Sequence, residues 1–123
     1  MCKILIAGNP NVGKSTLFNS LTKSSEHTGN FHGVTVEEKN KSINFNGVNY
    51  QFVDLPGIYS LNCFSYEEEV SKNYLLKEKN IVMLVDANSL RRNLYLSLQL
   101  TELNIEHSIF INNYDYFKKK NNI

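Results

Sequence analysis

The sequence predicts an α/β fold in which helices cover both faces of a mostly parallel β-sheet and one antiparallel hairpin forms an edge. Short apolar runs alternate along the chain with amphipathic helical segments, which is typical of parallel strands joined by crossover helices. Asn46-Gly47 separates two further extended segments, as in a hairpin with a type I′ turn. The length of 123 residues allows one domain.

The expected elements are five strands and three full helices. Residues 3–7 form a β-branched run that ends at Gly8 and suits a strand buried on both faces. A helix begins near Gly13, and the polar stretch 23–33 predicts a functional loop of about ten residues that can move. Further strands are expected on both sides of Asn46-Gly47, at 81–85 and at 107–111, and further helices around 70–75 and over 90–103.

Apolar spacing also predicts which side chains face the core. Alternation along the second hairpin strand favours burial of one of its faces, and 3.6-residue spacing favours one stripe on each helix. The residues expected inside are Val48, Tyr50 and Phe52 on the strand, Val70, Tyr74 and Leu75 on the middle helix, and Leu94, Tyr95, Leu98 and Leu100 on the last.

Composition argues against several classes of function. Thirteen Lys and Arg against twelve Asp and Glu give a net charge of +1, so neither nucleic acid nor an anionic membrane is an expected partner. The longest apolar run, 81–85, is far shorter than the roughly 20 residues of a membrane span, so a cytoplasmic location is expected. Cys2 and Cys63 form no CxxC pair, which argues against a disulfide or a zinc site.

The segment Gly8-Asn9-Pro10-Asn11-Val12-Gly13-Lys14-Ser15 fits the pattern G-x-x-x-x-G-K-[ST] between an expected strand and an expected helix. Its glycines would let the backbone wrap a phosphate. Lys14 would reach the β- and γ-phosphates, and the Ser15 hydroxyl would bind Mg²⁺. The structural alternative is a turn rich in Gly and Asn that Ser15 caps.

Two further segments could complete a phosphate and metal site. Asp54 ends a strand, where a carboxylate can hold Mg²⁺ through water, and the N–H of Gly57 can meet a γ-phosphate. Thr35 lies at the end of the long loop and can supply a second hydroxyl to the metal. As alternatives, Asp54 is a turn cap and Thr35 starts a strand.

The pattern N-x-x-D follows the last expected strand. The Asp115 carboxylate there could accept two hydrogen bonds from the N1–H and exocyclic amine of guanine, a donor pair that adenine lacks. Asn112 starts this pattern. The alternative is that Asp115 caps a following helix.

The segments GNPNVGKSTLFN, GNFHGVTVE, DLPGIYSL, VDANSLRRNLYLSLQL and NNYD, in this order and spacing, resemble the cytoplasmic GTPase domain of the bacterial ferrous iron transport protein B family. The resemblance covers essentially the whole chain. It implies a three-layer P-loop NTPase fold, the G domain, and a slow GTP-hydrolysing switch in a membrane protein that takes up ferrous iron. It also implies GTP or GDP, Mg²⁺ and K⁺ as ligands.

Residue by residue, the resemblance implies a long list of site residues. Nucleotide contacts are implied for Gly8, Asn9, Pro10, Asn11, Val12, Gly13, Lys14, Ser15, Thr16, Gly33, Val34, Thr35, Asp54, Leu55, Pro56, Gly57, Asn112, Asn113 and Asp115. Lys14, Thr35, Asn11 and Gly57 would act in catalysis, Ser15, Thr35 and Asp54 would hold Mg²⁺, and Asn11 would help hold K⁺. Partners would be the helical and transmembrane parts of the full-length protein and a nucleotide-dependent oligomer.

Departures from the general GTPase pattern leave alternatives open. Ile58 follows Gly57 where Ras-type proteins have a glutamine, so hydrolysis would use backbone, metal or a partner and be slow. His32 is either a general base or a solvated loop residue, and Asn113 replaces a lysine that stacks on guanine. Other functions that remain are a soluble GTPase of tRNA modification or ribosome assembly and a nucleotide sensor without turnover.

The family's G domain has a sixth strand, a further guanine-contact loop and a terminal helix after the position of Asp115. The sequence therefore predicts that residues 1–123 are an incomplete G domain. Its last strand would leave an apolar edge uncovered, with the aggregation risk of such edges.

Overall fold

The computed structural model describes residues 2–21, 25–31 and 33–121, and the sheet is built from strands in the order β2-β3-β4-β1-β5-β6. The strands are β1 (Cys2–Gly8), β2 (Ser25–Asn30), β3 (Glu37–Phe45), β4 (Val48–Asp54), β5 (Ile81–Asp86) and β6 (Ser108–Asn112). The helices are α1 (Lys14–Ser20), α2 (Tyr66–Lys77), α3 (Leu90–Glu102) and α4 (Tyr114–Lys120), with a 3-10 turn at Ala87–Ser89.

The direction of the strands determines where the connecting loops meet. β4, β1, β5 and β6 run parallel, whereas β2 and β3 are antiparallel to their neighbours. Ile6 pairs with Asp54, and Asp86 pairs with Asn112. The loops that follow β1, β4, β5 and β6 therefore leave the sheet along one edge, which is where open α/β sheets bind ligands.

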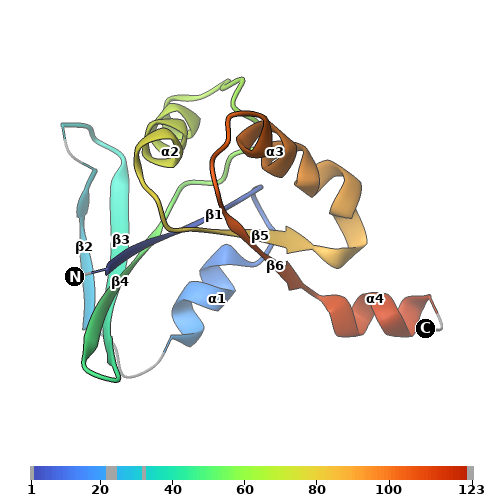
Figure 1. Cartoon of the computed structure of the whole chain (residues 1–123), viewed down its shortest axis with the longest axis horizontal. Helices are drawn as coiled ribbons and strands as arrows, with labels where there is room; N and C mark the ends of the chain where they lie inside the picture. Colours follow the sequence, from blue (N-terminus) through green and yellow to red (C-terminus); the bar gives the residue numbers. More distant parts are fainter. Residues whose placement is uncertain (1, 22–24, 32, 122–123) are drawn as a thin grey trace.

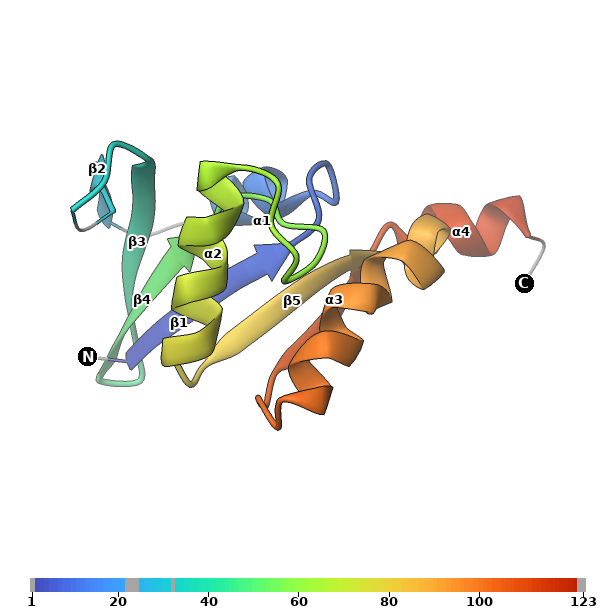
Figure 2. The same ribbon diagram turned by 90° about the horizontal axis from the view of Figure 1, so that it is seen from above.

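The fold has the three predicted layers. Figure 1 shows α2 and α3 on one side of the sheet and α1 on the other, and the view from above in Figure 2 agrees. The larger core lies under α2 and α3, and Phe18 of α1 packs on the opposite face. The fully buried residues of the larger core include Leu5, Ala7, Val53, Met83, Val85, Leu75, Leu96 and Leu100.

The predicted loop over 23–33 is wrong in its middle. Ser25–Asn30 forms β2, which pairs with β3 from Ser25↔Ser42 to Asn30↔Glu37. The strand lies at the edge of the sheet and its described side chains are exposed, so it needs no apolar alternation. Backbone pairing alone defines it, which is why hydrophobic periodicity could not reveal it. Residues 22–24 and His32 lie outside the described residues.

The predicted burial of the second hairpin strand is only partly correct. Val48 is exposed, and Tyr50 and Phe52 are half-buried. Helix α1 is only seven residues long and covers only part of the sheet face on its side. An open groove of about 890 Å³ continues beside it and is lined by Ile4, Tyr50 and Val82, among others.

Helix α3 turns a different stripe of residues toward the sheet than the spacing of its leucines and Tyr95 predicts. Leu96 and Leu100 are 0% exposed, but Tyr95 is 51% and Leu98 62% exposed. Two polar residues share the inward stripe because each has a partner there. Asn93 Oδ1 accepts from the backbone N–H of Asp86 at 2.7 Å, and Ser97 Oγ lies 2.5 Å from Nε2 of His107.

A buried lysine connects the antiparallel hairpin to the first helix. Lys41 of β3 is buried, and its Nζ donates to the backbone oxygen of Phe18 at 2.9 Å. The same ammonium lies 4.9 Å from the centre of the Phe18 ring. Phe18 is in the last turn of α1, where a cation also interacts favourably with the helix dipole.

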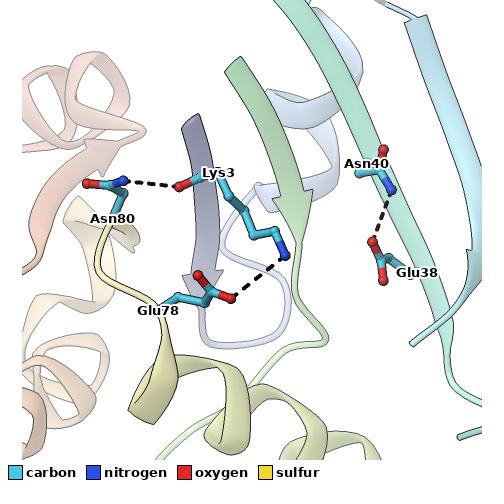
Figure 3. Close-up of polar contacts among 5 residues, drawn as sticks. All are labelled: Lys3, Glu38, Asn40, Glu78 and Asn80. Carbon is cyan, nitrogen blue, oxygen red and sulfur yellow. Dashed lines mark hydrogen bonds and ion pairs between the residues drawn. The ribbon is translucent and has the colours of Figure 1, made fainter. Parts of the chain in front are cut away.

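Surface contacts attach the link between α2 and β5 to the first strand (Figure 3). Asn80 Nδ2 donates to the backbone oxygen of Lys3 at 3.3 Å, and Lys3 Nζ lies 3.7 Å from Glu78 Oε1. On β3, Asn40 Nδ2 donates to Glu38 Oε1 at 3.0 Å. An exposed ion pair such as Lys3–Glu78 contributes at most about 1 kcal/mol, so these contacts add to a register that the core already sets.

The orientation of α3 is tested by a matched pair of substitutions. Leu96→Ala should lower the free energy of unfolding by about 2–5 kcal/mol, because it leaves a cavity in the core. Leu98→Ala, on the solvent side of the same helix, should change it by less than about 0.5 kcal/mol. Urea unfolding followed by circular dichroism measures both. Equal losses would contradict the orientation of the helix.

Candidate functional site

The loops after β1 and β4 are in direct contact. A Cβ on Gly57 would lie 2.9 Å from the backbone nitrogen of Pro10, a separation that packed atoms do not adopt. The backbone N–H of Ile58 donates to the oxygen of Gly8 at 2.9 Å, and that of Leu55 donates to Ile6 at 3.1 Å. The segment Asp54–Gly57 is therefore held against the glycine-rich loop by its backbone.

The shape of the glycine-rich loop requires its glycines. A Cβ on Gly8 would lie 2.6 Å from the backbone oxygen of Leu84. Gly13 has φ 98° and ψ 17°, a backbone conformation that residues with a side chain rarely adopt. Its backbone oxygen accepts the N–H of Leu17 in the first turn of α1. Asn11, between them, also has a positive φ of 66°. The loop thus turns directly from β1 into the helix.

Two opposite charges lie where these loops meet. Lys14 Nζ is 3.4 Å from Asp54 Oδ1, and the two side chains are only 10% and 13% exposed. Ser15 follows Lys14 in the first turn of α1. An ammonium can bind phosphate oxygens, and a carboxylate with a hydroxyl supplies the oxygen ligands that Mg²⁺ prefers. The donor set therefore fits a metal-bound phosphate.

Asn9 is a buried polar residue without a partner in the described structure. It is 2% exposed, and neither its amide nitrogen nor its oxygen has a hydrogen bond there. Leaving a buried amide unpaired costs roughly 1–3 kcal/mol. The protein alone leaves this group unsatisfied, inside the loop where the sequence predicts a ligand.

Asn112 brings the end of β6 to the same place. Its Nδ2 donates to the backbone oxygen of Val12 at 3.0 Å, and a Cβ on Gly13 would collide with that amide. The first residue of the predicted N-x-x-D pattern therefore contacts the glycine-rich loop across a hundred residues of sequence.

The next residue links the end of β6 to that of β5. Asn113 has a left-handed backbone and donates to Asp86 Oδ2 at 3.1 Å. Burial alone would raise the pKa of the Asp86 carboxyl, but hydrogen bonds from Asn88 and Asn113, together with the charge of Arg92, lower it below its ordinary value. Asp86 therefore stays ionised and orders both loops.

Asp115 lies farther out. It is exposed in the first turn of α4, and no hydrogen bond or ion pair involving it occurs in the described part of the chain. Figure 1 shows α4 extending beyond the sheet. This position fits the alternative in which the carboxylate favours the N-terminus of a helix, and it equally leaves the carboxylate open to a ligand.

The segment with Thr35 is attached to the core rather than to the charged pair. Phe31 is fully buried, its ring centre lies 5.0 Å from that of Tyr74, and its N–H donates to Val36. Thr35 is exposed, and none of the described contacts joins it to Lys14 or Asp54. Phe31 is thus the anchor of this segment, a role without a signal in the sequence.

The structure therefore divides the predicted site residues into three groups. At the junction of the loops are Gly8, Asn9, Pro10, Asn11, Val12, Gly13, Lys14, Ser15, Thr16, Asp54, Leu55, Pro56, Gly57 and Asn112. At its rim are Asn113 and Asp115. On the separate segment before β3 are Gly33, Val34 and Thr35.

Glu68 organises the loop after β4, a role that the sequence analysis missed. Its carboxylate is buried and accepts the backbone N–H of Phe64 at 3.0 Å and of Tyr59 at 3.4 Å. Ser65 Oγ accepts the N–H of Glu68 at 3.1 Å. Ser65 is therefore the N-cap of α2, and Glu68 returns to the N–H of the preceding residue, Phe64. The pattern Ser-x-x-Glu before a helix is visible in the sequence.

The described part of the chain has neither a cluster of metal-ligating side chains nor a helix that could cross a membrane. No group of three or more His, Cys, Asp or Glu side chains in residues 2–21, 25–31 and 33–121 is arranged to hold a metal ion. In the same ranges, every helix is too short or too polar to cross a bilayer.

Comparison with known proteins identifies the family of this chain. The profile of the family described as ferrous iron transport protein B matches residues 2–123. The Fe(2+) transporter FeoB of Methanocaldococcus jannaschii is 50% identical over 103 residues, which are 82% of this chain and 15% of that protein. The chain thus spans about a seventh of that relative's length.

Solved structures with the same fold come from the same family. The crystal structure of the G domain of the T. maritima FeoB iron transporter has a TM-score of 0.87 at 36% identity, over 97% of this chain and 76% of that one. The cytosolic domain of the same transporter in a GDP form has a TM-score of 0.88 at 36% identity, over 98% of this chain and 48% of that one. With a profile match over nearly its whole length and this shared fold, the chain belongs to the ferrous iron transport protein B family and has the fold of its G domain.

Proposed function

We propose that this chain binds GTP and GDP where the loops after β1, β4 and β6 meet, and that it hydrolyses GTP slowly. The observation that carries the proposal is the packing of Gly57 on Pro10 beside the Lys14–Asp54 pair. A group that enters the glycine-rich loop would meet the Lys14 ammonium and the backbone of Gly57 together. Such an arrangement suits the terminal phosphate of a nucleotide.

Two cations belong to the proposal. Ser15 and Asp54 would hold Mg²⁺, and Thr35 would join them if its segment moves toward the nucleotide. The exposed Asn11, at the turn of the loop, would help hold K⁺. Bound there, these ions would neutralise charge on the phosphates.

The residue after Gly57 supports slow turnover. Ile58 is fully buried in the core, and its backbone N–H is already used by Gly8. Neither its side chain nor its N–H is therefore available to orient an attacking water. Lys14 and the loop backbone would bind and align the phosphates, which leaves positioning and charge as the means of catalysis.

The same buried Ile58 favours a second candidate, a nucleotide sensor without turnover. In either case we propose that the chain acts on the cytoplasmic side of a membrane protein that takes up ferrous iron. The support for this role is that the chain belongs to the family. The chain spans only a small part of its relatives' length, so the role of the whole protein is a proposal. Nucleotide-dependent ordering of the segment 33–36 would be its signal.

Phosphate release separates the two candidates. With excess GTP and Mg²⁺, the chain should release phosphate slowly and faster in K⁺ than in Na⁺. Lys14→Ala should reduce the rate by about tenfold or more, because it removes a charge that stabilises the transition state. Lys118→Ala, on exposed α4, is the control and should keep the rate. If neither salt supports turnover, the hydrolase proposal is wrong and the sensor remains.

The base preference depends on Asp115. Asp115→Asn should weaken GTP binding on the order of 100-fold, because two hydrogen bonds to a carboxylate are lost, and should improve binding of xanthosine triphosphate. Titration with a fluorescent nucleotide measures both affinities. Glu102→Gln is the matched control, since it removes an exposed carboxylate elsewhere. Unchanged GTP affinity in Asp115→Asn would refute the proposed role.

We also propose that polypeptide outside these 123 residues completes the domain. Ile109, Phe110 and Ile111 of β6 are each about half-exposed, and β6 pairs on one side only among the described strands. The groove lined by Ile4, Tyr50 and Val82 is open beside it. An added strand and helix would cover both features.

This proposal predicts that the chain associates with itself through the edge of β6. Phe110→Lys should reduce the association, because charges on an edge strand oppose pairing. Phe45→Lys changes a comparably exposed residue on β3 and should leave association unchanged. Sedimentation velocity at several concentrations measures the effect. A chain that stays monomeric and melts cooperatively would contradict the proposal.

A further inference from the structure

We propose that an open pocket between the loop after β4 and the start of α3 binds a segment of a partner protein that carries neighbouring acidic residues. The pocket has a volume of about 390 Å³ and is lined by Tyr59, Ser60, Arg91, Arg92 and Tyr95. It is separate from the Lys14–Asp54 junction. The inference concerns protein binding and does not require GTP hydrolysis.

The chain concentrates its arginines at this pocket. Arg91 and Arg92 are the only two arginines in the sequence, and the other eleven of its thirteen Lys and Arg residues are lysines. Both are exposed, and neither forms an ion pair with a described residue. The charge of Arg92 reaches Asp86, but the oxygens of Asp86 already accept from Asn88 and Asn113. Both guanidinium groups are therefore able to bind a carboxylate in a bidentate manner.

Two tyrosines form the apolar walls. Tyr59 is 47% and Tyr95 51% exposed, so about half of each residue is open to solvent. Tyr95 follows Arg91 and Arg92 by four and three residues, so all three lie on one face of α3. Tyrosine and arginine, together with tryptophan, are enriched among the residues that contribute most to binding at protein interfaces. The pocket therefore offers apolar contact beside the positive charges.

The loop wall of the pocket is fixed before any partner arrives. The N–H of Leu61 donates to Gln99 Oε1 at 2.7 Å, which ties the loop to α3. The N–H of Tyr59 donates to buried Glu68, and Asn62 donates to Ser60 Oγ at 3.1 Å. A partner would therefore lose little affinity to ordering of this surface.

Charge selects a protein segment over RNA or a membrane. Two guanidinium groups match two or three carboxylates, while binding to an anionic bilayer takes about four to eight clustered basic residues. Glu67 and Glu69 are exposed at the start of α2, next to the loop that carries Tyr59. They would repel a long polyanion that extended past the pocket. A short acidic segment with one apolar side chain avoids this repulsion and fills the space between the tyrosines.

The test uses the 123-residue chain and a fluorescently labelled peptide of three glutamates and one leucine. Anisotropy should rise on binding, and a peptide with glutamines in place of glutamates should bind at least about tenfold more weakly because it lacks charge. Arg91→Gln combined with Arg92→Gln should weaken binding of the acidic peptide by about tenfold or more. Arg91→Lys combined with Arg92→Lys should restore only part of it, because lysine cannot bind in a bidentate manner.

The control removes the same charge from another surface. Lys118→Gln with Lys119→Gln on α4 should keep peptide affinity within about twofold, since these lysines are outside the pocket. Thermal melts and GDP titration check that each variant is folded. The proposal would be overturned if the double Arg→Gln variant bound the acidic peptide as tightly as the double Lys→Gln control. Equal binding of the glutamate and glutamine peptides would also overturn it. Tighter binding of oligouridylate or phosphatidylserine vesicles that depends on the arginines would overturn the choice of a protein partner.

Discussion

The close approach of Gly57 to Pro10 is the constraint on which the rest of the site depends. It exists because β1 and β4 are parallel neighbours whose register places Asp54 beside Ile6. Both loops then leave the sheet at the same edge and have no room for a side chain between them. The Lys14–Asp54 pair and the contact of Asn112 with Val12 follow from the same register of parallel strands.

The local sequence is sufficient to predict a loop or turn where the backbone conformation restricts which residue types can occupy it. The glycine-rich loop and the Asn46-Gly47 turn were predicted because positive φ angles restrict which residues can stand there. β2 was missed because an exposed edge strand needs only backbone pairing. Apolar spacing predicts that Tyr95 and Leu98 face the core, because periodicity cannot reveal that Asn93 and Ser97 have hydrogen-bond partners there.

The same limit applies to the candidate site. Residues of the loops after β1 and β4 lie against each other, because β1 and β4 are parallel neighbours in the sheet. The separation of Thr35 from that junction depends on Phe31 packing against Tyr74, a tertiary contact without a sequence signal. The contacts of Ser65 and Glu68 at the start of α2 do have such a signal, the pattern Ser-x-x-Glu before a helix.

Buried Lys41 has a mechanical consequence. Its ammonium joins β3 to the last turn of the helix that starts with Lys14 and Ser15. Pulling the hairpin away would strip that charge of its carbonyl partner and its aromatic neighbour, which is costly in a nonpolar surrounding. The hairpin and α1 are therefore mechanically coupled. A displacement of the hairpin is transmitted through Lys41 and α1 to the glycine-rich loop, without passing through the core.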